Sequence, residues 1–308
     1  MLTWKASMRA NRLSHTAVKI AKGMVYLGRD PETARFLPRG AAECSEKLLT
    51  HAGLMKSWEK SLYRAPWFRG FMGFMERRMM HGPLIFSLRK RFIEDETRDA
   101  ISKGATQVLS VGAGLDTLCV RLSAEFPEVT FVEADHPATH AVKRPAVEAM
   151  GATRANLHML GVDLASTTLR AALSPSGLWK TDARGVIVAE GVLMYLQEAA
   201  VSSLLEDARH SVGAGSRLLF TYLKKDAAGR IRVGRLGFLM RASLRVIGEA
   251  LNWGVRDRDE LRKLLELRGW RLDRDAERCD LGRRYLISPE PRISTREIEF
   301  MGMAEAID

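Results

Sequence analysis

Four segments that each follow a short apolar run contain the residues of this sequence best suited to bind a small molecule. They are SVGAGLDT at 110–117, FVEADHP at 131–137, GVDL at 161–164 and AEGVLMYL at 189–196. Each run has the length and apolar character of a strand that is buried on both faces. Ligands of open α/β sheets bind beyond the carboxyl ends of the strands, so four such ends in succession predict one shared site.

The first segment has the glycine turn of a nucleotide-binding site, with Gly112 and Gly114 between a strand and a helix. Glycine allows a ligand to approach the main-chain N–H groups closely. Position 117 is Thr, so the GxGxxG pattern is incomplete, and an adenosyl sulfonium has no pyrophosphate to require the third glycine. The turn alone is compatible with S-adenosylmethionine, with a dinucleotide or with no ligand.

The second segment places Glu133 and Asp135 at 21 and 23 residues after Gly112, near the spacing at which a carboxylate meets a ribose. Alternation along a strand directs both side chains to the same face. We expect one of them to accept hydrogen bonds from the ribose hydroxyls. The alternative for Asp135 is to cap the helix that begins at Pro137.

The third and fourth segments add Asp163 and Glu190 to the same edge, although both could instead cap the helices that follow. Tyr195 lies five residues after Glu190. Its hydroxyl could orient an acceptor oxygen, or the ring could be a core residue with its hydroxyl tied down.

From residue 104 onward, short apolar runs alternate with amphipathic segments of helix length, which predicts an α/β domain with a Rossmann-like sheet of seven strands. The predicted strands are Gln107–Val111, Val129–Ala134, Asn156–Val162, Gly185–Glu190, Arg217–Tyr222, Trp270–Leu272 and Arg284–Ile287. The predicted helices between them are Leu115–Glu125, Pro137–Met150, Gln197–Ser211 and Arg258–Leu267.

Residues 1–103 lack strand alternation and carry apolar residues at helical spacing, so we expect a helical N-terminal cap before a second domain at 104–308. The predicted helices of the cap are Ser14–Leu27, Ala41–His51, Trp58–Tyr63, Phe68–Met80 and Leu84–Lys103. A basic helical insertion is expected near 224–253, where it could close over a substrate, touch an anionic surface or form a plain surface helix.

Composition limits the partners and the location of the protein. The net charge is +11, and residues 1–103 hold 20 basic against 10 acidic residues, a field that favours an anionic partner. The three cysteines, Cys44, Cys119 and Cys279, show no metal-binding or disulfide spacing. The first twenty residues contain neither a continuous apolar run nor a signal pattern, so we expect a cytoplasmic protein without a membrane span.

The four segments, in this order and spacing, resemble the leucine carboxyl methyltransferase family of class I S-adenosylmethionine-dependent enzymes. The stretch Leu88–Asp95 also resembles the family's arginine-bearing helix, so the likeness covers roughly residues 84–220. The resemblance implies that Arg89, or Arg91 if the alignment slips, binds the methionine carboxylate of the cofactor. It further assigns Gly112 and its turn to the cofactor, Asp135 and Glu133 to the ribose, Asp163 with Leu164 to the adenine, and Glu190 to the amino or sulfonium end.

The expected reaction is methyl transfer from S-adenosylmethionine to an oxygen, by in-line displacement at the sulfonium carbon. A carboxylate acceptor is already ionised at neutral pH and needs no general base, whereas a phenol would need one. The family's bacterial members that methylate aromatic polyketide acids suggest a small anionic substrate. Aromatic and Met residues of the cap could line its pocket or simply pack the cap onto the sheet: Trp58, Tyr63, Trp67, Phe68, Phe71, Phe74, Met75, Met79 and Met80.

Other functions remain open from the sequence. Methylation of an RNA base or of a protein carboxyl terminus would also suit the positive charge and the family. A nicotinamide-dependent oxidoreductase would use the same sheet but should carry a complete GxGxxG. A non-catalytic nucleotide-binding domain would need only the binding site. Neither the acceptor nor the oligomeric state follows from the residues.

Overall fold

The computed structural model describes residues 13–75, 82–164, 166–174, 177–231, 250–276, 278–285 and 299–307. Its strands are β1 Gln107–Val111, β2 Thr130–Asp135, β3 Leu157–Gly161, β4 Gly185–Ala189, β5 Arg217–Leu223, β6 Trp270–Ala276 and β7 Glu299–Ala306. Helices α1 His15–Leu27, α2 Pro31–Ala34, α3 Ala41–His51, α4 Ser57–Arg64, α5 Pro66–Met75 and α6 Gly82–Ser102 precede the sheet. The others are α7 Leu118–Glu125, α8 Pro137–Ala149, α9 Leu169–Leu173, the 3₁₀ turn η3 Leu193–Tyr195, α10 Glu198–His210, α12 Arg258–Glu266 and α13 Arg278–Tyr285.

The seven strands form one sheet in the order β3-β2-β1-β4-β5-β7-β6. Strands β1 to β5 are parallel to one another, and β7 runs antiparallel between β5 and β6. The predicted Rossmann-like sheet of seven strands is therefore confirmed. The chain leaves β1 toward β2 on one side and later returns to β4 on the other, so β1 and β4 flank the switch point at which such sheets bind ligands.

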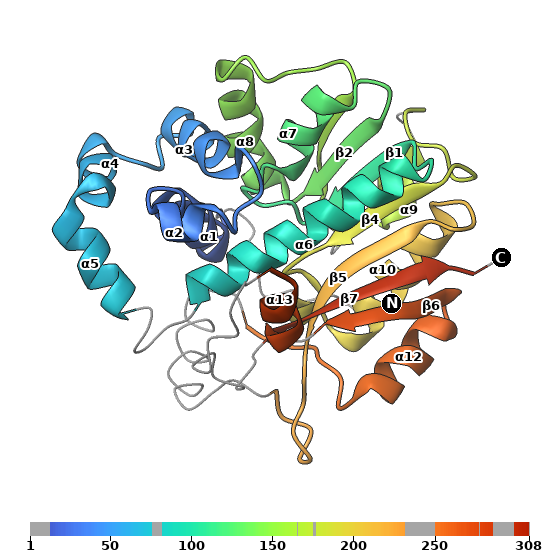
Figure 1. The fold of residues 1–308 in the computed structure, drawn as a ribbon. Coiled ribbons are helices and arrows are strands. Elements are labelled where there is room, and N and C mark those ends of the chain that lie inside the picture. The colour runs from blue at the N-terminus through green and yellow to red at the C-terminus, as the bar shows by residue number, and fades with distance from the viewer. Residues whose placement is uncertain are drawn as a thin grey trace.

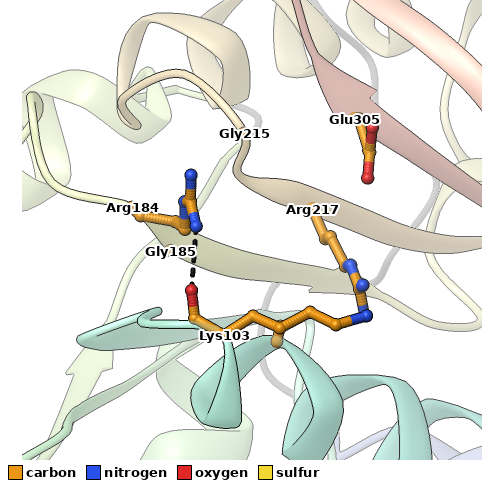
Figure 2. A pocket seen from close by; sticks show the side chains of 7 residues that line it. Lys103, Arg184, Gly185, Gly215, Arg217 and Glu305 are labelled. Carbon is orange, nitrogen blue, oxygen red and sulfur yellow. Dashed lines mark hydrogen bonds between the residues drawn. The ribbon is translucent and has the colours of Figure 1, made fainter.

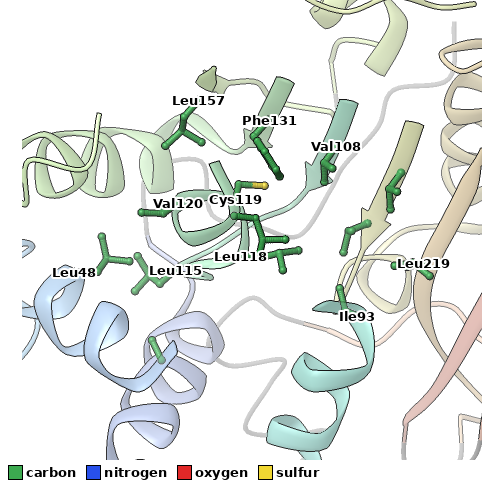
Figure 3. Packing of buried hydrophobic residues seen from close by; sticks show 14 of the residues in the cluster. Leu48, Ile93, Val108, Leu115, Leu118, Cys119, Val120, Phe131, Leu157 and Leu219 are labelled. Atoms are coloured by element: carbon green, nitrogen blue, oxygen red, sulfur yellow. The ribbon is translucent and has the colours of Figure 1, made fainter. Parts of the chain in front are cut away.

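Helices cover both faces of the sheet, and each face has its own hydrophobic core (Figure 1). Alternation along the strands divides the side chains: Val108 and Val188 point to one core, and Leu109 and Ile187 to the other. The first core joins the sheet to α1, α3, α6, α7 and α8, and Figure 3 shows Leu48 and Ile93 there together with Val108. The second core joins it to α9, α10 and α12.

The helices before residue 103 divide into two groups. Helices α1, α3 and α6 share the first core with the sheet, through residues such as Val25, Leu48 and Leu88. Helices α4 and α5 lie at the outer end of the molecule, away from the sheet (Figure 1). Part of the N-terminal region is thus continuous with the sheet domain, and α4 and α5 are its most peripheral part.

Buried charges fix the position of α6, the helix that carries Arg89. The carboxylate of Glu96, almost inaccessible to solvent, accepts hydrogen bonds from Arg274 Nη1 at 2.9 Å and from Arg284 Nη1 at 2.8 Å. Its other oxygen lies 3.3 Å from Arg217 Nη1 on β5. These contacts hold α6 against β5, β6 and α13, because the buried Glu96 carboxylate depends on these guanidinium groups for its hydrogen bonds.

One predicted strand is wrong. The segment Arg284–Ile287 was expected as the last strand, but Arg284 and Tyr285 belong to α13, and residues 286 and 287 lie outside the described ranges. The seventh strand is β7, whose register pairs Glu299 with Leu223 and Glu305 with Arg217 of β5. Its sequence EFMGMAEA mixes small, charged and Met residues, which gives no clear strand signal, and its place comes from two long-range neighbours.

The expected basic insertion at 224–253 is described only at its ends, because residues 232–249 lie outside the described ranges. The described ends are not helical: Lys225 bridges Ile231 across a turn, and Lys224 bridges Val255. Met79 and Met80, from the predicted helix Phe68–Met80, also lie outside these ranges. Within the described residues, no helix has both the length and the apolar character needed to cross a membrane.

Candidate functional site

The carboxyl ends of β1 and β4 carry the centre of the candidate site. Ser110 pairs with Val188 in the sheet, so Gly112 and Glu190 each follow two residues later on adjacent strands. Gly112 and Gly114 have φ of 62° and 54°, a left-handed conformation that favours glycine. A Cβ atom on Gly112 would lie 2.4 Å from Cγ2 of Val192, so no other residue fits under the loop that follows Glu190.

A cluster of five charged side chains joins α6 to this edge. Nε of Arg89 donates to Oε1 of Glu190 at 2.7 Å, and Arg89 also donates to Glu299 at the start of β7. The ammonium of Lys90 lies 2.8 Å from Oε2 of Glu190 and 3.0 Å from Oδ2 of Asp116. We call Arg89, Lys90, Asp116, Glu190 and Glu299 the edge cluster. It connects the helix, the glycine turn and the end of β4.

The surroundings of the two cations favour their charged forms. Burial alone would lower the pKa of the Arg89 guanidinium, but Glu299 and Glu190 raise it above its usual range. The same opposition raises the pKa of Lys90, where Asp116 and Glu190 outweigh burial. Arg89 also stacks on the ring of Phe86, with Cζ 4.8 Å from the ring centroid. The guanidinium is therefore held in a fixed orientation.

Arg91, the competing choice for the cofactor carboxylate, lies elsewhere. Its Nε donates to Oδ1 of Asp95 at 3.0 Å, one helical turn further along α6, and its side chain is partly exposed. Arg89 is the arginine that α6 brings to the end of β4.

Asp135 connects the second strand to the glycine turn. The Gly114 amide donates to its carboxylate, and the His136 amide donates to Oδ1 at 2.6 Å. The cap of α8 is instead His136, whose side chain accepts from the Ala138 amide. Burial raises the pKa of Asp135, although these amides and the positive charge of Lys143 act in the opposite direction. Asp135 thus faces the turn and does not cap the helix.

Glu133 occupies a different environment from Asp135. Its Oε2 lies 2.7 Å from the Lys143 ammonium of α8, and both side chains are buried inside the sheet-helix layer, 3% and 2% exposed. Burial raises the pKa of Glu133 even beside this cation. The alternation expected from the sequence holds, but only Asp135 stands at the carboxyl end of the strand, where it is partly exposed.

Asp163 and Leu164 follow β3 beside Asp135, because the Val162 amide donates to the Asp135 carbonyl at 2.7 Å. The Asp163 carbonyl accepts from the Ser166 and Thr167 amides and forms a turn. Tyr195 ends the turn η3 after β4, half-buried, and its carbonyl accepts from Asn252 Nδ2 at 2.8 Å. The structure therefore brings together the ends of β1, β2, β3 and β4, as the four segments predicted.

Three members of the edge cluster were not expected from the sequence. Lys90 and Asp116 adjoin residues that were singled out, but their contact depends on how α6 crosses the sheet. Glu299 lies 210 residues from Arg89. Asp116 could have been found from the sequence, because it lies in the segment that contains the glycine turn. Nothing in the local sequence pattern marks Glu299.

Asp116 makes a testable contribution to stability at the centre of the site. Burial works against its ionisation, but Lys90 and Lys143 outweigh it and lower its pKa from 3.8 to about 2. A carboxyl with a depressed pKa stabilises the fold above the unfolded value near 3.8, and this stabilisation is lost as the pH falls toward 2. The shift corresponds to about 2 kcal/mol.

We therefore expect Asp116→Asn to lower the free energy of unfolding by about 2 kcal/mol at pH 7. The difference in free energy of unfolding between Asp116→Asn and the wild type should become smaller as the pH falls from 5 to 3. Urea denaturation of both proteins at each pH measures it. A difference in free energy of unfolding that stays constant between pH 5 and pH 3 would contradict the depressed pKa of Asp116.

A cavity of about 260 Å³ lies at the opposite, amino-terminal edge of the sheet. Figure 2 shows Lys103, Arg184 and Arg217 around it, with Arg184 donating to the Lys103 carbonyl. Lys103 and Arg217 are already paired with Asp99, at 2.8 and 2.7 Å. This cavity is remote from the carboxyl ends of the strands, and two of its three cations already share an ion pair with Asp99.

Metal and disulfide chemistry find no support in the described residues. They contain no group of three or more His, Cys, Asp or Glu side chains that could hold a metal ion. Cys44 and Cys119 are free thiols, and burial raises the pKa of both. Cys279 belongs to α13, but its side chain is not among those described.

The family model of leucine carboxyl methyltransferases matches residues 29–209, which is more than half of the chain. The chain therefore belongs to this family of S-adenosylmethionine-dependent methyltransferases, as its motifs indicated, and the expected cofactor is confirmed as that of the family. Membership in this family also argues against the nicotinamide-dependent alternative.

Individual relatives agree with the family. A protein of Saccharopolyspora erythraea with the provisional name of an S-adenosyl-L-methionine-dependent methyltransferase is 30% identical over 200 residues, 61% of this chain and 64% of its own. YktD of Bacillus subtilis, provisionally named in the same way, is 28% identical over 135 residues, 44% of each chain. The matches thus span less than two thirds of the length of these curated relatives.

Solved structures confirm the class I methyltransferase fold. A provisionally assigned methyltransferase from Thermobifida fusca superimposes with a TM-score of 0.58 at 14% identity, over 85% of this chain and 94% of the other. A duf574 family protein from Streptomyces avermitilis gives 0.57 at 11% identity, over 86% and 97%. At this identity the likeness concerns the fold alone.

Proposed function

We propose that this protein transfers a methyl group from S-adenosylmethionine to the carboxylate oxygen of a small acid. The observation that carries the proposal is the Arg89–Glu190 pair at the switch point between β1 and β4, beside the turn at Gly112. A cofactor whose amino acid end has one carboxylate and one ammonium matches a site with one guanidinium and one carboxylate.

The described residues suit each part of this cofactor. Arg89 would bind its carboxylate, Glu190 its ammonium or sulfonium end, and the turn at Gly112 and Gly114 would lie against its main body. Asp135, the last residue of β2, would accept from the ribose hydroxyls. Glu133 is paired with Lys143 inside the protein, so we no longer include it in the ribose site.

The adenine would lie at the end of β3, where we place it against Asp163 and Leu164. Both follow the last residue of β3, and the backbone at Val162 is hydrogen-bonded to Asp135. This arrangement would place the adenine next to the ribose, because β3 and β2, which would carry the two contacts, are neighbours in the sheet.

The chemistry requires positioning more than acid–base catalysis. When bound, the cofactor supplies an electrophilic methyl carbon on its sulfonium. The acceptor oxygen would supply the electron pair of the new O–C bond, and the electron pair of the broken C–S bond would stay with the sulfur of a neutral thioether. A carboxylate acceptor has no proton to lose, so the chain needs to hold the oxygen in line with sulfur and to exclude water.

We propose that the acceptor has an apolar, aromatic or polyketide-like body, and that residues 1–103 act as the cap that receives it. Tyr63 and Phe68 pack against Tyr26 at ring-centroid distances of 6.0 and 6.2 Å. Four other large apolar side chains of α4 and α5 are more than half exposed: Trp58, Trp67, Phe71 and Phe74. Apolar surface of this kind favours contact with an apolar ligand.

The deciding experiment incubates the protein with methyl-labelled cofactor and a panel of aromatic carboxylic acids. Treatment of the products with mild base should release the label as volatile methanol, because methyl esters hydrolyse and methyl ethers and methylamines do not. Label that enters a product but resists base would overturn the carboxylate acceptor while leaving the methyltransferase intact.

Tyr195 is the side chain that we propose to orient the acceptor oxygen, since it follows Glu190 in the loop beyond β4. We expect Tyr195→Phe to lower kcat about tenfold, the effect of one hydrogen bond that is stronger in the transition state. Its affinity for S-adenosylhomocysteine should be unchanged. Equal activity of the variant and the wild type would leave Tyr195 as a packing residue only.

Methylation of an RNA base or a protein carboxyl terminus is the second candidate, favoured by the excess of 20 basic over 10 acidic residues in 1–103. Binding to RNA would weaken steeply with salt, because Lys and Arg contacts release counterions from the phosphates. A filter-binding titration at two salt concentrations, with transfer RNA as probe, distinguishes this candidate from the small acid.

A further inference from the structure

Glu299 is a partly buried carboxylate whose main partner is Arg89. As the first residue of β7 it pairs with Leu223 of β5, and its side chain is 14% exposed. One of its oxygens accepts from Arg89 Nη1. The other, Oε1, is buried and has no hydrogen-bond partner in the described part of the chain. A buried carboxylate oxygen without a partner is costly, so its position needs a reason.

The edge cluster contains more negative than positive charge. Among the described residues, Asp116, Glu190 and Glu299 form their ion pairs with Arg89 and Lys90, while Lys143 and Arg121 act on Asp116 from further away. Lys90 is shared between Asp116 and Glu190, and Arg89 between Glu190 and Glu299. Nε and Nη1 of Arg89 are therefore each engaged by a carboxylate of the protein itself.

The proposed function requires the same guanidinium for the carboxylate of the cofactor. A second carboxylate at Nη1 of Arg89 would compete with Glu299 for the same N–H donor, because two like charges that close repel each other. Glu190 has a separate role toward the ammonium of the cofactor. Glu299 is the partner of Arg89 to which the proposed function gives no role toward the cofactor.

We propose that Glu299 is an internal substitute for the cofactor carboxylate. It holds Arg89 in place while the site is empty, and the carboxylate of the arriving cofactor displaces it. Glu299 then sets the cofactor affinity by competition, and it couples the start of β7 to occupation of the site. This inference rests on the proposed function, since it requires that the site binds S-adenosylmethionine through Arg89.

The test compares Glu299→Gln with the wild type by calorimetric titration with S-adenosylhomocysteine. Gln keeps the shape of the side chain but removes the competing charge, so we expect the variant to bind about tenfold more tightly. Glu299→Asp keeps the charge with a shorter reach and should show a smaller gain. Glu305→Gln changes the same residue type at the other end of β7, where Glu305 pairs with Arg271, and should not change the affinity.

A second ligand separates competition at Arg89 from a general effect on the fold. 5′-Methylthioadenosine is the same molecule without the amino acid end, so its affinity should be equal in Glu299→Gln and the wild type. Tighter binding of S-adenosylhomocysteine alone supports the proposal. The competition is overturned if Glu299→Gln binds S-adenosylhomocysteine no more tightly than the wild type does. It is also overturned if the affinities for both ligands change equally. The proposed function stands in either case. A wild type that binds neither ligand would overturn the proposed function itself.

Discussion

Asp135→Ala is expected to weaken binding of S-adenosylhomocysteine about 100-fold, because each hydrogen bond to a charged group contributes about 1.5–3 kcal/mol. The carboxylate belongs to the last residue of β2 and already accepts from the Gly114 amide, so its loss removes the ribose contact and loosens the turn. Calorimetric titration measures the affinity. Asp135→Asn keeps an acceptor for the Gly114 amide, so its affinity for S-adenosylhomocysteine should lie between that of Asp135→Ala and that of the wild type.

The matched control is Asp259→Ala, an exposed aspartate of α12 on the other side of the sheet, which should bind like the wild type. Thermal denaturation without ligand confirms that both variants are folded. Glu190→Ala should also lose affinity, through the ammonium of the cofactor. Unchanged affinity in both Asp135→Ala and Glu190→Ala would show that the ligand does not bind at this edge of the sheet.

The strand ends of the candidate site could be predicted because each is marked by local residue types. Gly112 and Gly114 have positive φ, and a strand followed by such glycines is a signal contained in a few neighbouring residues. Burial on both faces makes β4 a continuous run of small and apolar residues and β1 a mostly apolar one. Once the strands are known to be parallel, their carboxyl ends must meet at one edge.

The contacts within the site could not be predicted because they join residues that are distant in sequence. Arg89 is 101 residues from Glu190 and 210 from Glu299, and the spacing of a motif contains no information on such a pairing. The error at Arg284–Ile287 has a related cause. A short apolar segment fits a helix or a strand equally well, and its neighbours in space decide which one forms.

The two acidic residues of β2 illustrate the limit of a periodic pattern. Alternation correctly gives Glu133 and Asp135 the same face, but it does not say where along the strand the helix layer ends. Glu133 lies under α8 beside Lys143, and Asp135 lies two residues further, at the edge. Equal residue types on one face can therefore serve stability in one position and binding in the next.

Glu133→Gln is accordingly expected to lower the free energy of unfolding by about 3 kcal/mol while changing the affinity for S-adenosylhomocysteine less than about twofold. The substitution leaves the Lys143 ammonium buried, 2% exposed, without its opposite charge 2.7 Å away. Breaking a buried ion pair costs more than the pair contributes, because the remaining charge has lost its hydration. Urea denaturation and calorimetric titration of the same preparation measure the two quantities.

The double variant Glu133→Gln with Lys143→Met tests the cause of that loss. It removes both charges at nearly constant volume, so its stability should return to within about 1 kcal/mol of the wild type. A double variant as unstable as the single one would mean that packing around Glu133, and not the charge of Lys143, is responsible. A single variant that keeps its stability but binds the ligand as weakly as Asp135→Ala would instead return Glu133 to the ribose site, since only contact with the ligand could produce that combination.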